Sequence, residues 1–251
     1  MSSLSFVSMS LAAVTAASLI GCTDAATEPT DADYDQVAQS LGAASPSERN
    51  AVVVTTQLAA GTVPIGLSLV TLGQFQGIVF GVDFHLTVEC RDAAGAAMAC
   101  GDNTASASID TAWSGELTLP NLHVAAMRSG TWTLSGLTTD RTTIDGGAQF
   151  TLESDFTSVT QEVQRSLDVS ADVAYDAVVV DDGSHRFVGG EIRYDVSATR
   201  TRTTPEGEDS AALSIDAVVT FAADGSATLV LDGDHTYRLD AATGAVIRVG
   251  S

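Results

Sequence analysis

The chain has 251 residues, which is enough to bury a substantial core in one large β domain or two small ones. It carries 32 acidic and 11 basic residues, for a net charge of −21, and every basic residue is an arginine. This balance argues against nucleic acid as a partner, because phosphate binding needs clustered cations. The absence of lysine excludes Schiff-base and Ser/Lys catalysis. A solubilising surface explains the acidic charge, with a cation site or a basic partner as the alternative.

The N-terminus has the pattern of an export signal. Residues 1–21 contain no charged side chain, and the apolar run from Leu11 to Ile20 is shorter than the roughly 20 residues that a spanning helix needs. The run ends in Leu19-Ile20-Gly21-Cys22. This tetrapeptide resembles the lipobox of bacterial lipoproteins, in which the cysteine thiol receives a diacylglycerol and the peptide is cut before it. An ordinary secretory signal before an unmodified cysteine is the alternative.

The resemblance implies that residues 1–21 are a signal peptide and that Cys22 is lipidated. Each buried methylene contributes about 0.8 kcal/mol, so several acyl chains hold a protein to a membrane where one would not. Thr23, rather than Asp, follows the cysteine, which by the sorting rule of enteric bacteria implies the outer membrane. We therefore expect a lipid-anchored protein of the cell envelope that faces the periplasm or the cell surface. Residues 22–32 are small, polar and acidic, and predict a flexible tether.

A short amphipathic helix is predicted at the start of the folded part, over residues 33–41. Asp31 or Asp33 is the expected cap, and Gly42 the expected end. An expected polar break follows from Ser45 to Asn50. The apolar positions at helical spacing are Tyr34, Val37 and Leu41.

Residues 50–82 contain no charged side chain. Glycine, proline and glutamine nevertheless interrupt every window that is long enough to cross a membrane. We therefore expect a buried helix, loop or strand here that covers the rest of the fold, rather than a transmembrane helix.

From Val82 onward, apolar and polar residues alternate with a period of two, the pattern of strands with one buried face. The first run covers 82–89, and four more cover 109–119, 167–176, 192–199 and 213–221. Tight turns separate the runs, and such short links make neighbouring strands pair antiparallel. The turn pairs are Asp182-Gly183, Asp224-Gly225, Asp232-Gly233 and Thr243-Gly244.

This pattern of alternating runs and tight turns predicts a mainly β fold. We expect an antiparallel meander of about eight to ten strands in a single domain, residues 33–251, with a short N-terminal helix. A sheet with one apolar face must curl onto itself, close into a barrel or be covered. We expect a curled sheet or a barrel-like sandwich, with the uncharged segment 50–82 as a cover or plug.

Cys90 and Cys100 remain once Cys22 is lipidated, and they lie symmetrically about Gly95. If a hairpin turns there in an oxidising compartment, the two cysteines face each other on adjacent strands and form a disulfide. The alternative is a metal or redox pair. A metal site would need further Cys or His ligands, and His85 is the nearest in the sequence. In a redox pair, the two cysteines are usually separated by only two residues.

The sequence contains no catalytic, cofactor or phosphate-binding motif, and we predict no cofactor and no metal. His85, with Asp83 and Glu89 on one strand face, is a conceivable zinc or acid/base corner, and otherwise a solvated trio. Asp181-Asp182-Gly183 and Asp232-Gly233-Asp234 could suggest calcium, but turn chemistry explains them. Trp113 and Trp132 could line a pocket or belong to the core.

Three functions follow as hypotheses. The first is a non-enzymatic envelope lipoprotein, structural or protein-binding, with an acidic sheet surface. The second is a carrier of a lipid or small hydrophobic ligand, which a cavity of about 300 Å³ or more lined by the apolar stripes would favour. The third is an enzyme on a β scaffold, with His85 in a concave pocket as its marker.

Overall fold

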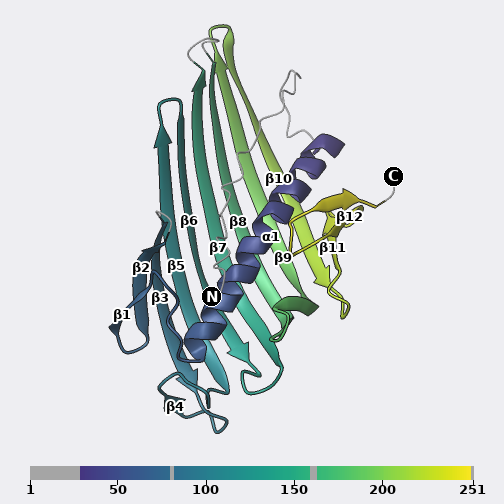
Figure 1. Cartoon of the computed structure of the whole chain (residues 1–251). Helices are drawn as coiled ribbons and strands as arrows, with labels where there is room; N and C mark the ends of the chain where they lie inside the picture. The colour runs from purple at the N-terminus through teal and green to yellow at the C-terminus, as the bar shows by residue number, and fades with distance from the viewer. Residues whose placement is uncertain (1–28, 80–81, 159–162, 250–251) are drawn as a thin grey trace, which may run out of the picture.

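The computed structural model describes residues 29–79, 82–158 and 163–249. It consists of one long helix and a single antiparallel sheet that arches over the helix (Figure 1). The predicted signal peptide, Cys22 and most of the predicted tether lie outside the described residues. Within the described ranges, no helix combines the length and the hydropathy needed to cross a bilayer.

The helix α1 covers Asp31–Ala59 and is therefore much longer than the predicted helix at 33–41. Its cap is Thr30, not Asp31 or Asp33. The Thr30 side chain accepts a hydrogen bond from the Asp33 N–H, and the Asp33 carboxylate accepts one from the Thr30 N–H at 2.9 Å. This reciprocal capping box satisfies backbone donors that the first helical turn leaves free.

Two further expectations about this helix are wrong, because both the polar break at Ser45–Asn50 and the end at Gly42 lie inside α1. Glu48 is buried against the sheet, so tertiary contacts hold a segment in the helix whose composition favours a loop. At Gly42, an added Cβ would lie 2.3 Å from Cγ2 of Val246 and 2.6 Å from the carbonyl oxygen of Gly244. The glycine therefore allows a close approach of the C-terminal hairpin and does not end the helix.

The mainly β antiparallel meander is confirmed. The described residues form thirteen strands, more than the expected eight to ten, in one sheet whose hydrogen-bonded neighbours follow chain order. Only β4 leaves this path, where it pairs with β3. The path from β1 to β13 is open, so the sheet does not close into a barrel. The strands are β1 (Ser68–Thr71), β2 (Gln74–Val79), β3 (Val82–Arg91), β4 (Ala97–Met98), β5 (Ser106–Leu119), β6 (Leu122–Ser135), β7 (Arg141–Ser158), β8 (Val163–Asp181), β9 (Arg186–Thr204), β10 (Gly207–Phe221), β11 (Ala227–Leu231), β12 (His235–Leu239) and β13 (Val246–Arg248).

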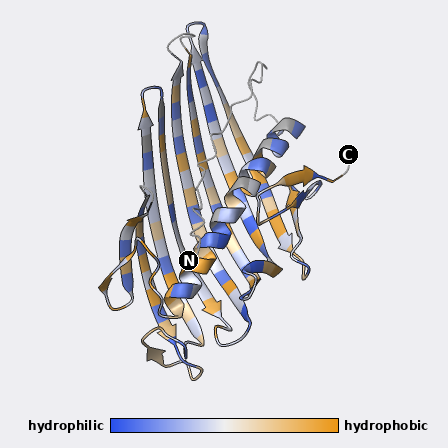
Figure 2. Cartoon of the chain, in the orientation of Figure 1, coloured by the Kyte–Doolittle hydropathy of each residue, from blue (hydrophilic) through white to orange (hydrophobic). Residues whose placement is uncertain are grey.

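The uncharged segment 50–82 serves two purposes. Its first part completes α1, which covers part of the apolar face of the sheet (Figure 1). Its second part forms β1 and β2, which extend the sheet at one edge. Hydrophilic and hydrophobic residues alternate along the long strands, as the period of two predicts (Figure 2).

Irregular pairing crosses three neighbouring strands and bends the sheet around α1. The register shifts between Ile144 and Gly146 on β7, and between Asp176 and Val179 on β8. Gly190 on the adjacent strand has a φ of +81°, and a Cβ there would lie 2.1 Å from the carbonyl oxygen of Ala177. Such bulges increase local bend and twist, which lets long strands curve around a helix.

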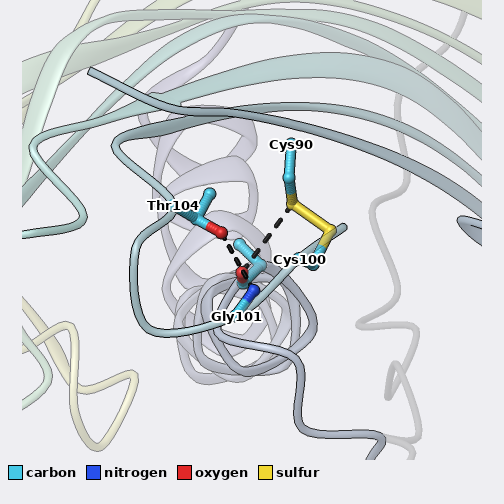
Figure 3. The surroundings of a disulfide bond; sticks show 5 residues. Cys90, Cys100, Gly101 and Thr104 are labelled. Atoms are coloured by element: carbon cyan, nitrogen blue, oxygen red, sulfur yellow. Dashed lines mark hydrogen bonds between the residues drawn. A yellow bond between two sulfur atoms is a disulfide. The ribbon is translucent and has the colours of Figure 1, made fainter. Parts of the chain in front are cut away.

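The predicted disulfide between Cys90 and Cys100 is confirmed, with Cα atoms 5.2 Å apart (Figure 3). The two cysteines are not directly opposite in register, because Cys90 pairs with Met98 and Cys100 follows the end of β4. Beyond the bridge, the Gly101 N–H donates to the Thr104 hydroxyl at 3.0 Å. Cys90 is only 3 % exposed, so the bridge links the turn to the buried end of β3.

We expect Cys90→Ala/Cys100→Ala to lower the free energy of unfolding by about 2–3 kcal/mol, because the bridge removes loop entropy from the unfolded chain. Urea denaturation measures this loss. A reducing agent should lower the stability of the wild type to a similar degree and leave the variant unchanged. Equal stability of the two proteins would contradict the prediction.

Candidate functional site

The register of β5 to β10 aligns side chains in rows across the face of the sheet that α1 contacts. The row through Trp132 and Tyr175 lies under the helix, and all its large side chains are less than 5 % exposed. Successive rows lie about 6–7 Å apart along the strands. The row through Arg128 and Phe150 is the last in which a described residue bonds to α1.

Three further rows continue beyond Arg128, where the long strands extend past the helix (Figure 1). We name these three rows the open face. Where the structure describes their burial, its apolar side chains are all partly or largely exposed, and Phe156 and Leu119 reach 41 % and 50 %. The apolar residues of the open face are Leu119, Val124, Ala126, Leu152, Phe156, Leu167, Val169, Ala198, Ala211 and Leu213.

A buried ion pair marks the boundary between the covered rows and the open face. Arg128 on β6 and Glu48 on α1 form a bidentate pair, in which the second guanidinium nitrogen lies 2.9 Å from the Glu48 carboxylate, and both side chains are 9 % exposed. The Tyr175 hydroxyl also donates to Glu48. Burial opposes the charge on Arg128, but the Glu48 carboxylate and the Tyr175 hydroxyl together outweigh it and raise the pKa of Arg128. Burial, followed by the charge of Glu48, raises the pKa of Tyr175.

Three arginines lie at one corner of the open face, where β8 and β9 approach their ends. Arg165 pairs in register with Arg202, and Arg200 lies two residues before Arg202 on the same face. None of the three forms an ion pair within the described part of the chain. The only acidic residue in the described rows of the open face is Asp209, which lies opposite Arg202 in register.

The opposite face of the same strands is acidic. Asp172, Asp195 and Asp216 lie directly side by side on β8, β9 and β10, and line a shallow hollow of about 910 Å³. Small residues such as Gly147 and Ala174 form its floor. Among the described residues, no group of three His, Cys, Asp or Glu side chains is arranged to hold a metal ion. This hollow is shallow and lies on the outward face, so it is not a cavity enclosed by the apolar stripes, which is what a hydrophobic carrier was expected to have.

The other candidate residues from the sequence lie at different places in the fold. His85 and Asp83 lie on this same outward face, with side chains 63 % and 53 % exposed and their charged atoms 3.6 Å apart. They therefore do not line a concave pocket. Trp132 is core, at 1 % exposed, while Trp113 is half-buried in the boundary row beside Arg128.

The suspected calcium turns bond to the protein itself. The Asp181 carboxylate accepts hydrogen bonds from the backbone N–H and the hydroxyl of Ser184, and these bonds lower the pKa of Asp181. The Asp232 carboxylate accepts a bond from the Tyr34 hydroxyl at 2.7 Å and another from the Asp216 N–H at 2.8 Å. Turn geometry and helix contacts thus explain these acids.

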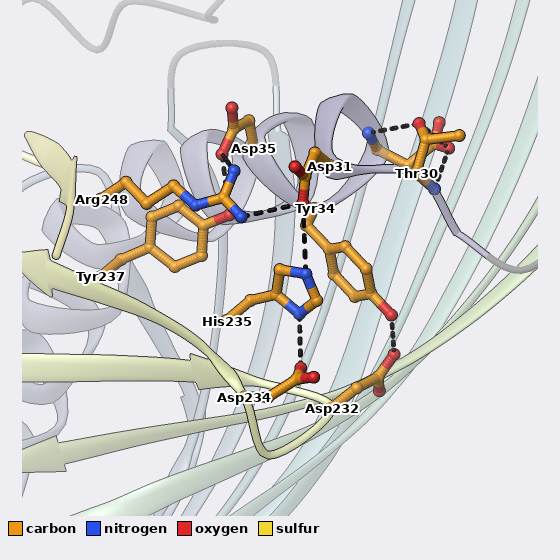
Figure 4. Close-up of polar contacts among 10 residues, drawn as sticks. Thr30, Asp31, Tyr34, Asp35, Asp232, Asp234, His235, Tyr237 and Arg248 are labelled. Atoms are coloured by element: carbon orange, nitrogen blue, oxygen red, sulfur yellow. Dashed lines mark hydrogen bonds and ion pairs between the residues drawn. The ribbon is translucent and has the colours of Figure 1, made fainter. Parts of the chain in front are cut away.

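Polar contacts fasten the start of α1 to the last strands (Figure 4). The Tyr237 hydroxyl donates to Asp35 at 2.8 Å, and burial together with this bond raises the pKa of Tyr237 to about 12. Arg248 donates to Asp31 at 2.8 Å and so lowers the pKa of that carboxyl. The Tyr34 ring stacks on His235 with centroids 3.7 Å apart. Because these groups bond to one another, the cluster has a structural role.

Comparison with known proteins identifies no relative: no family model matches the chain, and neither a curated protein nor a solved structure matches it. The open face and its arginine corner were not found from the sequence. A signal was present in the alternation, because Arg165, Arg200 and Arg202 all fall at positions of the apolar stripe.

We expect Glu48→Gln to lower the free energy of unfolding by about 3–5 kcal/mol, because it leaves the buried charge of Arg128 unpaired. Chemical denaturation measures the loss. Glu89→Gln, which removes an exposed partner 3.9 Å from Arg91, is the control and should cost less than about 1 kcal/mol. Glu48→Leu/Arg128→Met, which removes both charges, should recover much of the stability. If Glu48→Gln cost no more than the control, the pair would not hold the helix.

Proposed function

We propose that this protein is a lipid-anchored lipoprotein of the cell envelope that binds a hydrophobic molecule on the open face. The open face is the observation that supports binding. Its three rows belong to the same apolar stripe that builds the core, yet described residues leave them partly exposed, and Leu119 and Phe156 largely so. Contiguous exposed apolar surface on a folded protein is characteristic of ligand, membrane or protein contacts.

A hollow beneath the helix is too small for such a ligand. The hollow between α1 and the end of β8 measures about 130 Å³ and is lined by residues such as Val52 and Val180. Ligand pockets usually measure about 300 Å³ or more. The large hollow of the outward face is shallow and does not enclose a ligand, and Asp172, Asp195 and Asp216 lie along it. The binding surface in this proposal is therefore an open face and not the enclosed cavity that the sequence suggested.

The anchor in this proposal rests on the lipobox resemblance at Cys22. The helix cap Thr30 is the eighth residue after Cys22. Since an extended chain spans at most about 3.6 Å per residue, the cap would lie within about 29 Å of the lipidated residue. Such a short link would keep the open face near a membrane, where hydrophobic molecules are concentrated.

Binding is testable with the uncharged fluorescent dye N-phenyl-1-naphthylamine. We expect Leu152→Asp/Val169→Asp to weaken dye binding at least about tenfold, because the change would place two carboxylates side by side at the centre of an apolar row of the open face. The matched control is Thr151→Asp/Ser170→Asp, which adds the same charges to the adjacent register pair on the outward face. The control should bind as the wild type does. Absence of dye binding to the wild type would favour a purely structural role.

The anchor has its own test. A clickable palmitate analogue should label the wild-type chain in a Gram-negative host and should not label Cys22→Ser. The labelled wild type should fractionate with membranes, because several acyl chains give stable attachment. Equal labelling of the two chains would refute lipidation at Cys22 and leave the dye experiment unaffected.

A further inference from the structure

The arginine corner has an electrostatic cost that the described residues do not offset. Arg165 and Arg202 occupy directly opposite positions on adjacent strands, and like charges in such a pair destabilise a sheet. Arg200 adds a third positive charge on the same face. Asp209 is opposite Arg202 in register but does not approach it within ion-pair distance. A bound anion would offset this repulsion.

Positive and negative side chains lie on opposite faces of these strands, although the chain as a whole has a net charge of −21. Where β7 to β10 cross the open face, the inward positions carry three arginines and one aspartate. The outward positions of the same segments carry acids. These outward acids are Glu153, Asp155, Asp168 and Glu208. Solubility alone would not place the cations on the apolar side.

The register also sets the arginines beside apolar side chains. Arg165 pairs with Phe156 on one side, and Arg200 pairs with Leu167. From this corner, successive apolar rows follow one another along the strands, up to the row that contains Trp113 and Phe150 at the helix boundary. A molecule with an anionic head and an apolar tail would match this surface from end to end, because guanidinium groups form strong bonds to carboxylates and phosphates.

We propose that the open face binds an anionic amphiphile, whose acyl chain lies on the apolar rows and whose carboxylate or phosphate is bound by Arg165, Arg200 and Arg202. This inference rests on the proposed function and names its ligand class. It commits to a lipid acquired from outside the chain. The acyl groups expected on Cys22 carry no anionic head, so they would leave the three arginines without a counter-charge. A second copy of the chain, docked by the same face, would bring its own three arginines close to these.

The test compares two ligands with the same hydrocarbon chain, oleate and oleyl alcohol, as competitors of the bound dye. The protein is the full-length chain with Cys22→Ser, so that it carries no acyl group of its own. We expect oleate to displace the dye about tenfold more tightly than oleyl alcohol, and this preference should shrink as ionic strength rises. This comparison needs no substitution in the folded part.

Two triple variants with the same net charge then locate the effect. Arg165→Gln/Arg200→Gln/Arg202→Gln should retain dye binding and remove the preference for oleate. The control, Arg91→Gln/Arg193→Gln/Arg238→Gln, removes three exposed arginines from the outward face and should keep the full preference. Equal loss in both triples would mean that net charge, not the corner, produces the preference, and would overturn the inference.

The outcomes separate this inference from the proposed function. Equal binding of oleate and oleyl alcohol by a protein that binds the dye would overturn the inference and leave the proposed function intact. Failure of the dye and both competitors to bind would remove the proposed function itself. Sedimentation of a dimer that Leu152→Asp/Val169→Asp dissociates would assign the open face to a second copy, which would also overturn the inference.

Discussion

The structure depends on how much of a one-sided sheet a single helix can cover. A helix of 29 residues is about 44 Å long, and the longest strands, with 19 residues, extend for about 63 Å. α1 crosses these strands obliquely, so it buries only the part of each strand that lies beneath it (Figure 1). The three rows of the open face have no helix over them among the described residues. Length mismatch therefore creates the open face.

The position of the helix is fixed by polar groups and not only by apolar packing. Glu48 and Arg128 remove two charges from water, and such a pair adds little net stability over apolar residues. It does penalise every other alignment of helix and sheet, because each would leave a buried charge alone. Bonds from Tyr34 and Tyr237 set the other end. The ion pair thus determines where the covered rows end.

The strand pattern was predictable because a sheet that is buried on one face has alternating apolar and polar residues along each strand. The runs at 82–89 and 213–221, the turns and the disulfide were predicted on that basis. The strand β6 was missed, since its inward positions include Arg128 and Gly130, which blur the alternation. The helix was predicted too short because Gly42 and the polar segment Ser45–Asn50 favour a helix end. The contacts of Glu48 overcome this local preference, and they also hold Pro46 inside the helix, where proline costs about 3 kcal/mol. The open face could not be predicted, because its exposure depends on where the helix ends.

The order of assembly follows from the meander. Every strand pairs with a neighbour in sequence, so the sheet can grow by local hairpins, which are kinetically favourable steps. The helix is different: although it precedes the sheet in the chain, Tyr34 meets Asp232, 198 residues later. Its docking can finish only after the final hairpins exist. During early folding the whole apolar stripe would therefore be exposed, and the chain would be prone to aggregate until the helix docks.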